Sequence, residues 1–110
     1  MNQGVKTILY PVNDMAQSKM LFTNFLGVEP YVDSPYYTGF KVDNQDIGLI
    51  PNSPEGVAVA FFHVEDISKS LQVLTDAGAT VIRNINDVGG GRLVASVKDT
   101  SGNVIGLVQN

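Results

Sequence analysis

The chain has 110 residues, which is enough for one domain with its own core and too few for two ordinary domains. Its 7 lysines and arginines against 11 aspartates and glutamates give a net charge of −4 without a basic cluster, which argues against nucleic acid as a partner. The lack of cysteine excludes disulfides, thiolate nucleophiles and zinc–thiolate sites.

The chain also lacks the patterns of a targeting or membrane-spanning segment. Its first residues do not place a basic segment before an apolar one. The longest apolar run, around residues 57–62, is much shorter than a membrane span. We therefore expect a soluble, cytoplasmic protein with no membrane partner.

The first half of the chain predicts a strand, a helix and three further strands. Residues 7–14 form an apolar run that ends in Val-x-Asp, where Asp14 is a good N-cap with Gln17 three residues later. The helix carries an apolar stripe and ends at Gly27. Strand-like runs rich in Val, Tyr, Phe and Ile follow at residues 28–32, 36–42 and 46–50.

The second half repeats this order. Residues 59–66 match residues 7–14 at an offset of 52, a second helix runs from Asp66 to Gly78, and strands follow at 79–83, 92–97 and 103–108. The last strand of each half contains Ile-Gly-Leu, centred on Gly48 and Gly106. Neither half has enough core to be stable alone. We therefore predict a single domain over residues 1–110, with modules at about 5–52 and 57–110.

Strand alternation gives candidate residues on the faces of this sheet. Residues 36–40 of one third strand align with residues 92–96 of the other at an offset of 56, so Arg92 and Ser96 face a cavity if Phe40 does. Arg92 follows three glycines and could pair with a carboxylate or phosphate. A solvated arginine at a strand start is the open alternative.

His63 is the only histidine, so a metal site built on two histidines is excluded within one chain. Alternation puts it on one face with Val59 and Phe61, where it could contact a ligand or act as a general base. A histidine hydrogen-bonded to backbone at a strand end is the alternative. Seven aromatic residues could line a pocket or simply fill the core: Tyr10, Tyr31, Tyr36, Tyr37, Phe40, Phe61 and Phe62.

The runs ILYPVND and FLGVEPY around the first helix, with VKDTSGNVIGLVQ near the end, resemble the vicinal oxygen chelate superfamily. That family includes glyoxalase I, extradiol dioxygenases and the bleomycin and fosfomycin resistance proteins. The resemblance implies an α+β fold in which two βαβββ modules form an open eight-stranded half barrel, with helices on the convex side and a ligand cavity on the concave side. It also implies a homodimer.

The metal-dependent members of this family hold one divalent cation with four side chains from the first and last strands of each module. The matching positions are Thr7, Gly48, Val59 and Gly106. These residues offer no imidazole or carboxylate, which are the donors that such a metal requires. We therefore expect no metal site and assign no cofactor.

We predict a glyoxalase/bleomycin resistance-like protein that binds a small aromatic or anionic molecule in its concave cavity, and we assign no catalytic residue. The candidate ligand contacts are the residues that alternation or resemblance places on that face: Thr7, Leu9, Tyr36, Phe40, Gly48, Val59, Phe61, His63, Arg92, Ser96 and Gly106. One alternative is an enzyme of the lyase, isomerase or dioxygenase type, either metal-dependent through unrecognised ligands or metal-free through His63 and Arg92. The other is an interaction module whose cup is filled by its own side chains or by a partner chain.

Overall fold

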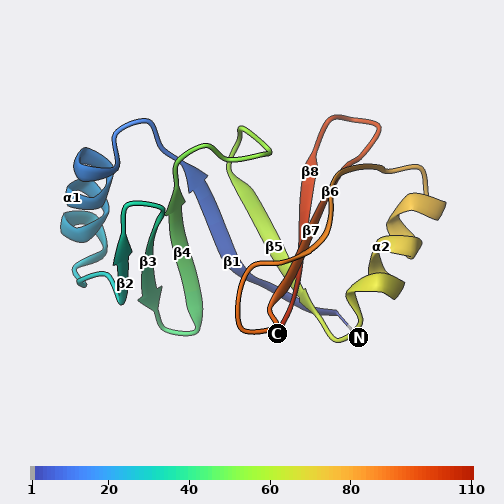
Figure 1. Cartoon of the computed structure of the whole chain (residues 1–110), viewed down its shortest axis with the longest axis horizontal. Helices are drawn as coiled ribbons and strands as arrows, with labels where there is room; N and C mark the ends of the chain where they lie inside the picture. The colour runs from blue at the N-terminus through green and yellow to red at the C-terminus, as the bar shows by residue number, and fades with distance from the viewer. Residues whose placement is uncertain (1) are drawn as a thin grey trace.

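Eight strands form one mixed sheet and two helices lie against it in the computed structural model, which describes residues 2–110 (Figure 1). The first half contains β1 (Asn2–Pro11), α1 (Met15–Leu26), β2 (Val32–Ser34), β3 (Tyr37–Val42) and β4 (Gln45–Ile50). The second half contains β5 (Val59–Val64), α2 (Ile67–Asp76), β6 (Thr80–Asp87), β7 (Leu93–Lys98) and β8 (Val104–Gln109). The strand order is β2-β3-β4-β1-β5-β8-β7-β6, which confirms the predicted α+β fold of two βαβββ modules in an open half barrel.

The two halves join where β1 pairs antiparallel with β5. Thr7 lies opposite Phe61 and Leu9 lies opposite Val59. Within each half the first strand pairs parallel with the last, β1 with β4 and β5 with β8. Thr7 and Val59 are 52 residues apart, as are Leu9 and Phe61, so the two pairs are equivalent under the repeat. The ladder therefore agrees with the offset of 52 found in the sequence. We call this junction the seam.

Both helices begin at the aspartates predicted as N-caps, and α1 ends at the predicted Gly27, whereas the C-cap of α2 is Ala77, one residue before the predicted Gly78. The carboxylate of Asp14 accepts a hydrogen bond from the backbone N–H of Gln17, and that of Asp66 accepts one from Lys69, each at 3.1 Å. Gly27 ends α1 with a φ of 75°, a left-handed conformation that glycine adopts without a steric penalty. The two helices thus start at equivalent points of the repeat.

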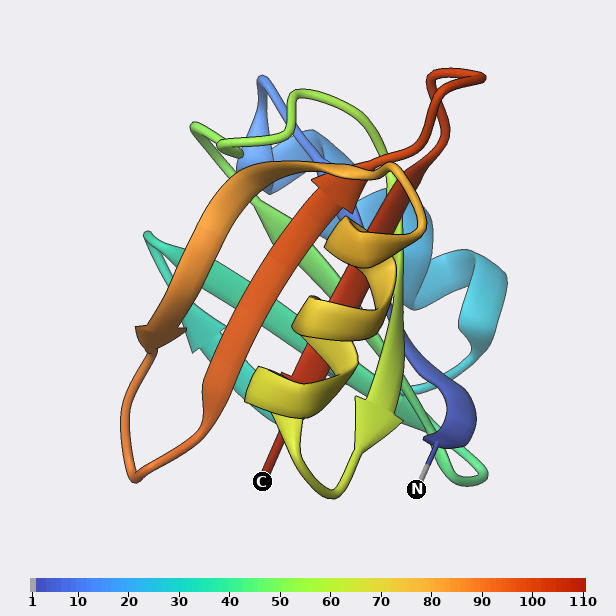
Figure 2. The same cartoon turned by 90° about the vertical axis from the view of Figure 1, so that its right-hand side faces the viewer.

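The helices cover one face of the sheet, which we call the helix face. Under α1, the rings of Tyr10 and Phe22 lie 5.3 Å apart and those of Phe22 and Phe40 lie 6.3 Å apart. Figure 2 shows α2 lying over the strands of the second half, where it packs against Val64, Leu107 and their neighbours. The opposite face, which we call the open face, carries its own apolar cluster: Val59, Phe61, Val94 and Val108, with Leu9 and Val104 against it.

Two glycines of the open face are covered by neighbouring side chains. A Cβ at Gly106 would lie 2.5 Å from Cδ2 of Phe61, and a Cβ at Gly48 would overlap Leu9 and the ring of Tyr37. These contacts are too close for any real side chain. Glycine therefore lets an aromatic ring of the adjacent strand lie directly on the sheet backbone, as close approaches in strands require.

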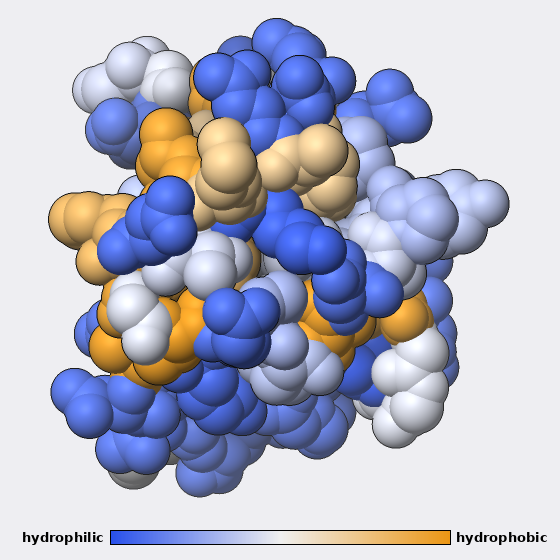
Figure 3. Space-filling model, turned by 90° about the vertical axis from the view of Figure 1, so that its left-hand side faces the viewer, coloured by the Kyte–Doolittle hydropathy of each residue, from blue (hydrophilic) through white to orange (hydrophobic). Residues whose placement is uncertain are grey.

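The outer surface of α1 is apolar as well. Met20, Leu21 and Phe25 are 61%, 56% and 78% exposed, respectively. Figure 3, which views the molecule from the side of α1, shows apolar side chains in several patches between polar ones. Neither helix within residues 2–110 combines the length and apolar character needed to cross a membrane.

Three strands differ from the sequence prediction by more than one residue. β1 starts at Asn2 instead of residue 7, and β6 extends to Asp87 instead of 83. β2 covers only Val32–Ser34, although residues 28–32 were predicted. The β1–β5 and β6–β7 ladders shift register in these regions. Each shift interrupts the side-chain alternation on which the prediction relied.

We predict that Gly106→Ala lowers the free energy of unfolding by about 1–3 kcal/mol, because the added methyl group overlaps Phe61. Urea unfolding followed by circular dichroism measures this cost. The same substitution in a Phe61→Ala background is the control and should cost less, since the overlapping ring atoms are gone. Equal costs in the two backgrounds would show that the ring does not set the constraint.

Candidate functional site

A cavity of about 460 Å³ opens on the open face and crosses the seam. Its walls come from both halves of the chain, namely from β1, the segment 31–37, β4, β5, β6, the segment 88–94 and β8. The lining residues are Thr7, Leu9, Tyr31, Val32, Tyr36, Tyr37, Ile50, Phe61, Arg83, Val88, Arg92, Val94 and Val108. The cavity is thus mainly apolar and aromatic, with two arginines as its cationic groups.

Tyrosine rings form one wall of the cavity. The hydroxyl of Tyr31 donates a hydrogen bond of 2.8 Å to Oδ1 of Asp46, and Nζ of Lys41 lies 5.0 Å from the centre of the Tyr31 ring. Burial and the bond to Asp46 raise the pKa of Tyr31 above that of an ordinary phenol, and burial likewise raises the pKa of Tyr37. Both hydroxyls therefore stay protonated at neutral pH, and the single hydroxyl proton of Tyr31 is already donated to Asp46.

Arg92 reaches the cavity from the β6–β7 hairpin. The backbone N–H of Val88 donates to the carbonyl of Arg92 at 2.9 Å, and the N–H of Arg92 donates to the carbonyl of Gly89 at 3.1 Å, which closes the hairpin. Within residues 2–110 the guanidinium of Arg92 has no hydrogen bond or ion pair to another side chain. Its five N–H donors are thus available to a bound molecule.

Arg83, the other arginine of the cavity, is already paired. Its guanidinium contacts Oε2 of Glu55 through Nε at 3.1 Å and through a terminal nitrogen at 2.9 Å. The hydroxyl of Ser96 donates to the same oxygen at 2.7 Å. The side chain of Glu55 is only 2% exposed, so this is a buried ion pair supported by an additional hydrogen bond.

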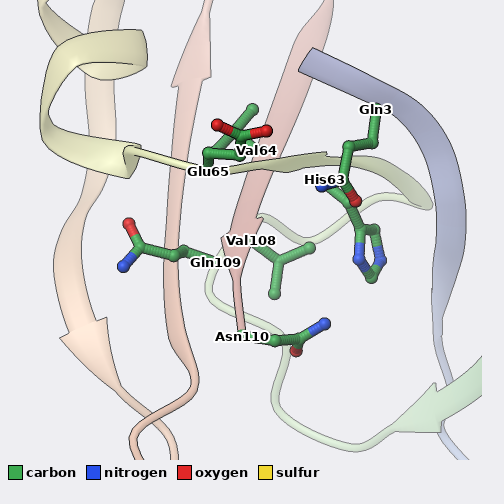
Figure 4. A pocket seen from close by; sticks show the side chains of 7 residues that line it. All are labelled: Gln3, His63, Val64, Glu65, Val108, Gln109 and Asn110. Carbon is green, nitrogen blue, oxygen red and sulfur yellow. The ribbon is translucent and has the colours of Figure 1, made fainter. Parts of the chain in front are cut away.

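His63 lies beside the cavity, in a separate pocket of about 360 Å³ (Figure 4). Its Nε2 is 2.9 Å from the hydroxyl of Thr7, a hydrogen bond that crosses the seam. Burial and the positive charges of Arg92 and Lys6 lower the pKa of His63, against the opposite effect of Asp46. The pocket is mostly polar and is lined by Gln3, His63, Val64, Glu65, Val108, Gln109 and Asn110.

The structure places most of the predicted site residues on the open face. Five of them line the cavity: Thr7, Leu9, Tyr36, Phe61 and Arg92. Val59 is buried in the apolar cluster of that face, and Ser96 is buried against Glu55. Gly48 and Gly106 lie beneath side chains, and His63 lines the neighbouring pocket. Contact of any of them with a ligand stays a prediction.

Phe40 is the exception, because it is fully buried in the cluster under α1 on the helix face. Placing it toward the cavity was wrong. Gly39 pairs with Gly48 and Ser96 pairs with Gly106, so the third strands are related by an offset of 57 and not 56. A shift of one residue moves a strand side chain to the other face of the sheet.

The sequence prediction did not assign several residues that shape the site, among them two tyrosines and one ion pair. Tyr31 and Tyr37 were recognised as aromatic residues but were not assigned to the cavity. In the ladder, Tyr37 stands two residues before the partner of Gly48 and Val94 two residues before the partner of Gly106, so the two side chains take equivalent places in the cavity wall. Glu55 and Arg83 are 28 residues apart and show no local pattern that links them.

The four positions at which the resemblance implies metal ligands do not fit a divalent cation. The hydroxyl of Thr7 is bonded to His63, Val59 is an apolar core residue, and the two glycines are covered by Leu9, Tyr37 and Phe61. In the part of the chain that the structure describes, no three His, Cys, Asp or Glu side chains group closely enough to hold a metal ion.

Comparison with known proteins gives one family and several similar structures. The sequence profile of the Glyoxalase/Bleomycin resistance protein/Dioxygenase superfamily matches residues 4–107. A member of this superfamily from Vibrio splendidus 12B01 is 17% identical with a TM-score of 0.74, and each chain is covered to 100%. A search of curated proteins finds no match.

Two enzymes share the fold at similarly low sequence identity. A methylmalonyl-CoA epimerase variant from Streptomyces coelicolor, in complex with 2-nitronate-propionyl-CoA, has a TM-score of 0.82 at 14% identity, covering 100% of this chain and 96% of the epimerase. An NAD-dependent benzaldehyde dehydrogenase from Legionella pneumophila has a TM-score of 0.76 at 15% identity, covering 94% and 96%. Likeness at such identities shows the fold and identifies no substrate.

We predict that stability falls as pH drops from about 7.5 to about 5.5, because the lowered pKa of His63 means that the unfolded chain takes up the proton first. The slope is limited to the uptake of one proton. Urea unfolding across this range measures it. His63→Gln, which can still bond Thr7, should have a flatter profile. Identical profiles for the two proteins would contradict a contribution from His63.

Proposed function

Since the chain belongs to the glyoxalase/bleomycin resistance protein/dioxygenase superfamily, we propose that it is a binding protein for small aromatic anions. The cavity of the open face is the proposed binding site. The ring of the ligand lies among Tyr31, Tyr36, Tyr37 and Phe61, and its carboxylate or phosphate pairs with Arg92. Apolar walls with one well-placed charged group are typical of small-molecule sites.

The observation that carries this proposal is the guanidinium of Arg92. It lines a largely apolar cavity, and no side chain within residues 2–110 pairs with it. A planar guanidinium can bind a carboxylate through two parallel hydrogen bonds, which gives both affinity and orientation. Tyr36, 80% exposed beside it, offers a ring face at the entrance of the cavity.

The arrangement of His63 favours binding over a metal-free reaction that uses His63 and Arg92 together. The two side chains line different pockets, and among the described residues only Val108 lines both pockets. The ring of His63 is also engaged with Thr7 through Nε2. A general base must reach its substrate within hydrogen-bond distance, so one small molecule in the cavity would not serve both groups.

Benzoate should bind more tightly than the neutral benzamide, and Arg92→Gln should weaken benzoate binding by about tenfold or more, because one charge-assisted pair is lost. Isothermal titration calorimetry measures both affinities. Lys69→Gln removes the same charge from the exposed side of α2, away from the cavity, and should leave them unchanged. If benzamide binds as well as benzoate, or if Arg92→Gln has no effect, anion binding at Arg92 is wrong.

We further propose that the protein is a homodimer, and that the exposed apolar side chains of α1 take part in the interface. Phe25, Met20 and Leu21 lie close together on one helix, and such exposed apolar groups commonly mark contact surfaces. Size-exclusion chromatography with light scattering should then give twice the chain mass. Phe25→Asp should shift the protein toward the monomer, whereas Asn24→Asp, the same charge change next to it, should not. A monomeric parent protein would refute the dimer.

A further inference from the structure

Segment 51–58, which connects β4 to β5, places a carboxylate inside the second half of the open face. Oε2 of Glu55 accepts hydrogen bonds from Arg83 and Ser96, and Oε1 accepts a longer one of 3.4 Å from the hydroxyl of Ser53. The side chain is 2% exposed, although most of the segment around it is exposed. The carboxylate of Glu55 thus occupies the donors of Arg83 and Ser96, which could otherwise bind an anion in this region.

This contact leaves the two arginines of the cavity in different states. Arg83 has its guanidinium engaged by Glu55, with 17% of the side chain exposed. Arg92 lines the same cavity without a side-chain partner within residues 2–110. No other lysine or arginine is found among the described residues that line the cavity. The cavity therefore presents one free guanidinium to a ligand.

We propose that Glu55 is a specificity-determining residue that restricts the site to ligands with a single carboxylate. This inference rests on the proposed binding of anions at Arg92. A second carboxylate carried across the ring from Arg92 toward Arg83 meets a guanidinium that is already neutralised, and it lies near the negative charge of Glu55. It would lose its hydration without gaining a free donor, which is unfavourable in a buried site.

The parent protein provides the first test. Monomethyl terephthalate and terephthalate have the same ring, but at neutral pH the ester carries one negative charge and the diacid carries two. By calorimetry the ester should bind at least about tenfold more tightly than terephthalate, since the second carboxylate finds no free donor. Equal affinities, or tighter binding of terephthalate, would overturn the inference whatever the variants do.

Glu55→Gln provides the second test. Glutamine keeps the shape of the side chain and removes its charge, which releases the guanidinium of Arg83 toward the cavity. The preference for the ester over terephthalate should then fall by about tenfold or reverse. Glu29→Gln, an exposed position with the same charge change, should retain the parent preference. Circular dichroism confirms that each variant is folded.

The double variant Glu55→Gln/Arg83→Gln separates the freed arginine from a general loss of negative charge. It should regain the parent preference, because the guanidinium that accepts the second carboxylate is gone. If Glu55→Gln does not change the preference for the ester while benzoate still binds at Arg92, the role of Glu55 is refuted and the proposed function is not. Failure of the parent to prefer benzoate over benzamide would instead refute the proposed function.

Discussion

The pairing of β1 with β5 is the interaction on which the open face depends. It is the ladder that joins the two halves of the sheet, and it sets Thr7 opposite Phe61 and Leu9 opposite Val59. The cavity takes its walls from both sides of this seam, and the Thr7–His63 hydrogen bond spans it in a buried position. The site is therefore a property of the joined halves, since neither half alone supplies both the tyrosine wall and the arginines.

The glycines of β4 and β8 decide how the space beside the seam is used. Without side chains at positions 48 and 106, Tyr37, Leu9 and Phe61 fold over the backbone of the neighbouring strands. The resemblance implies metal ligands of metal-dependent members at these positions, whereas glycine offers no donor atom here and apolar and aromatic side chains cover it. The side chains at the centre of the open face can therefore offer ring contacts and hydrogen bonds, and their packing on the two glycines sets their positions.

Much of the fold could be predicted because its landmarks are local. Asp14 and Asp66 mark equivalent helix starts, and Gly48 and Gly106 mark equivalent strands, so the duplication could be recognised without any contact information. Phe40 was misplaced because the offset assumed between the third strands was one residue too small, and alternation alone does not reveal such an error. The pairing of Glu55 with Arg83 joins distant segments through tertiary structure, which no periodicity encodes.

Glu55 lies between the two copies of the repeated unit, although its carboxylate reaches into the second one. The scaffold and the charge of the site are consequently encoded in separate stretches of the chain. The strands must conserve their register to preserve the sheet, whereas a connecting loop tolerates substitution and changes in length far more readily. Evolution or protein engineering could therefore retune which anions the cup accepts by altering a few linker residues, while both copies of the duplicated unit stay as they are.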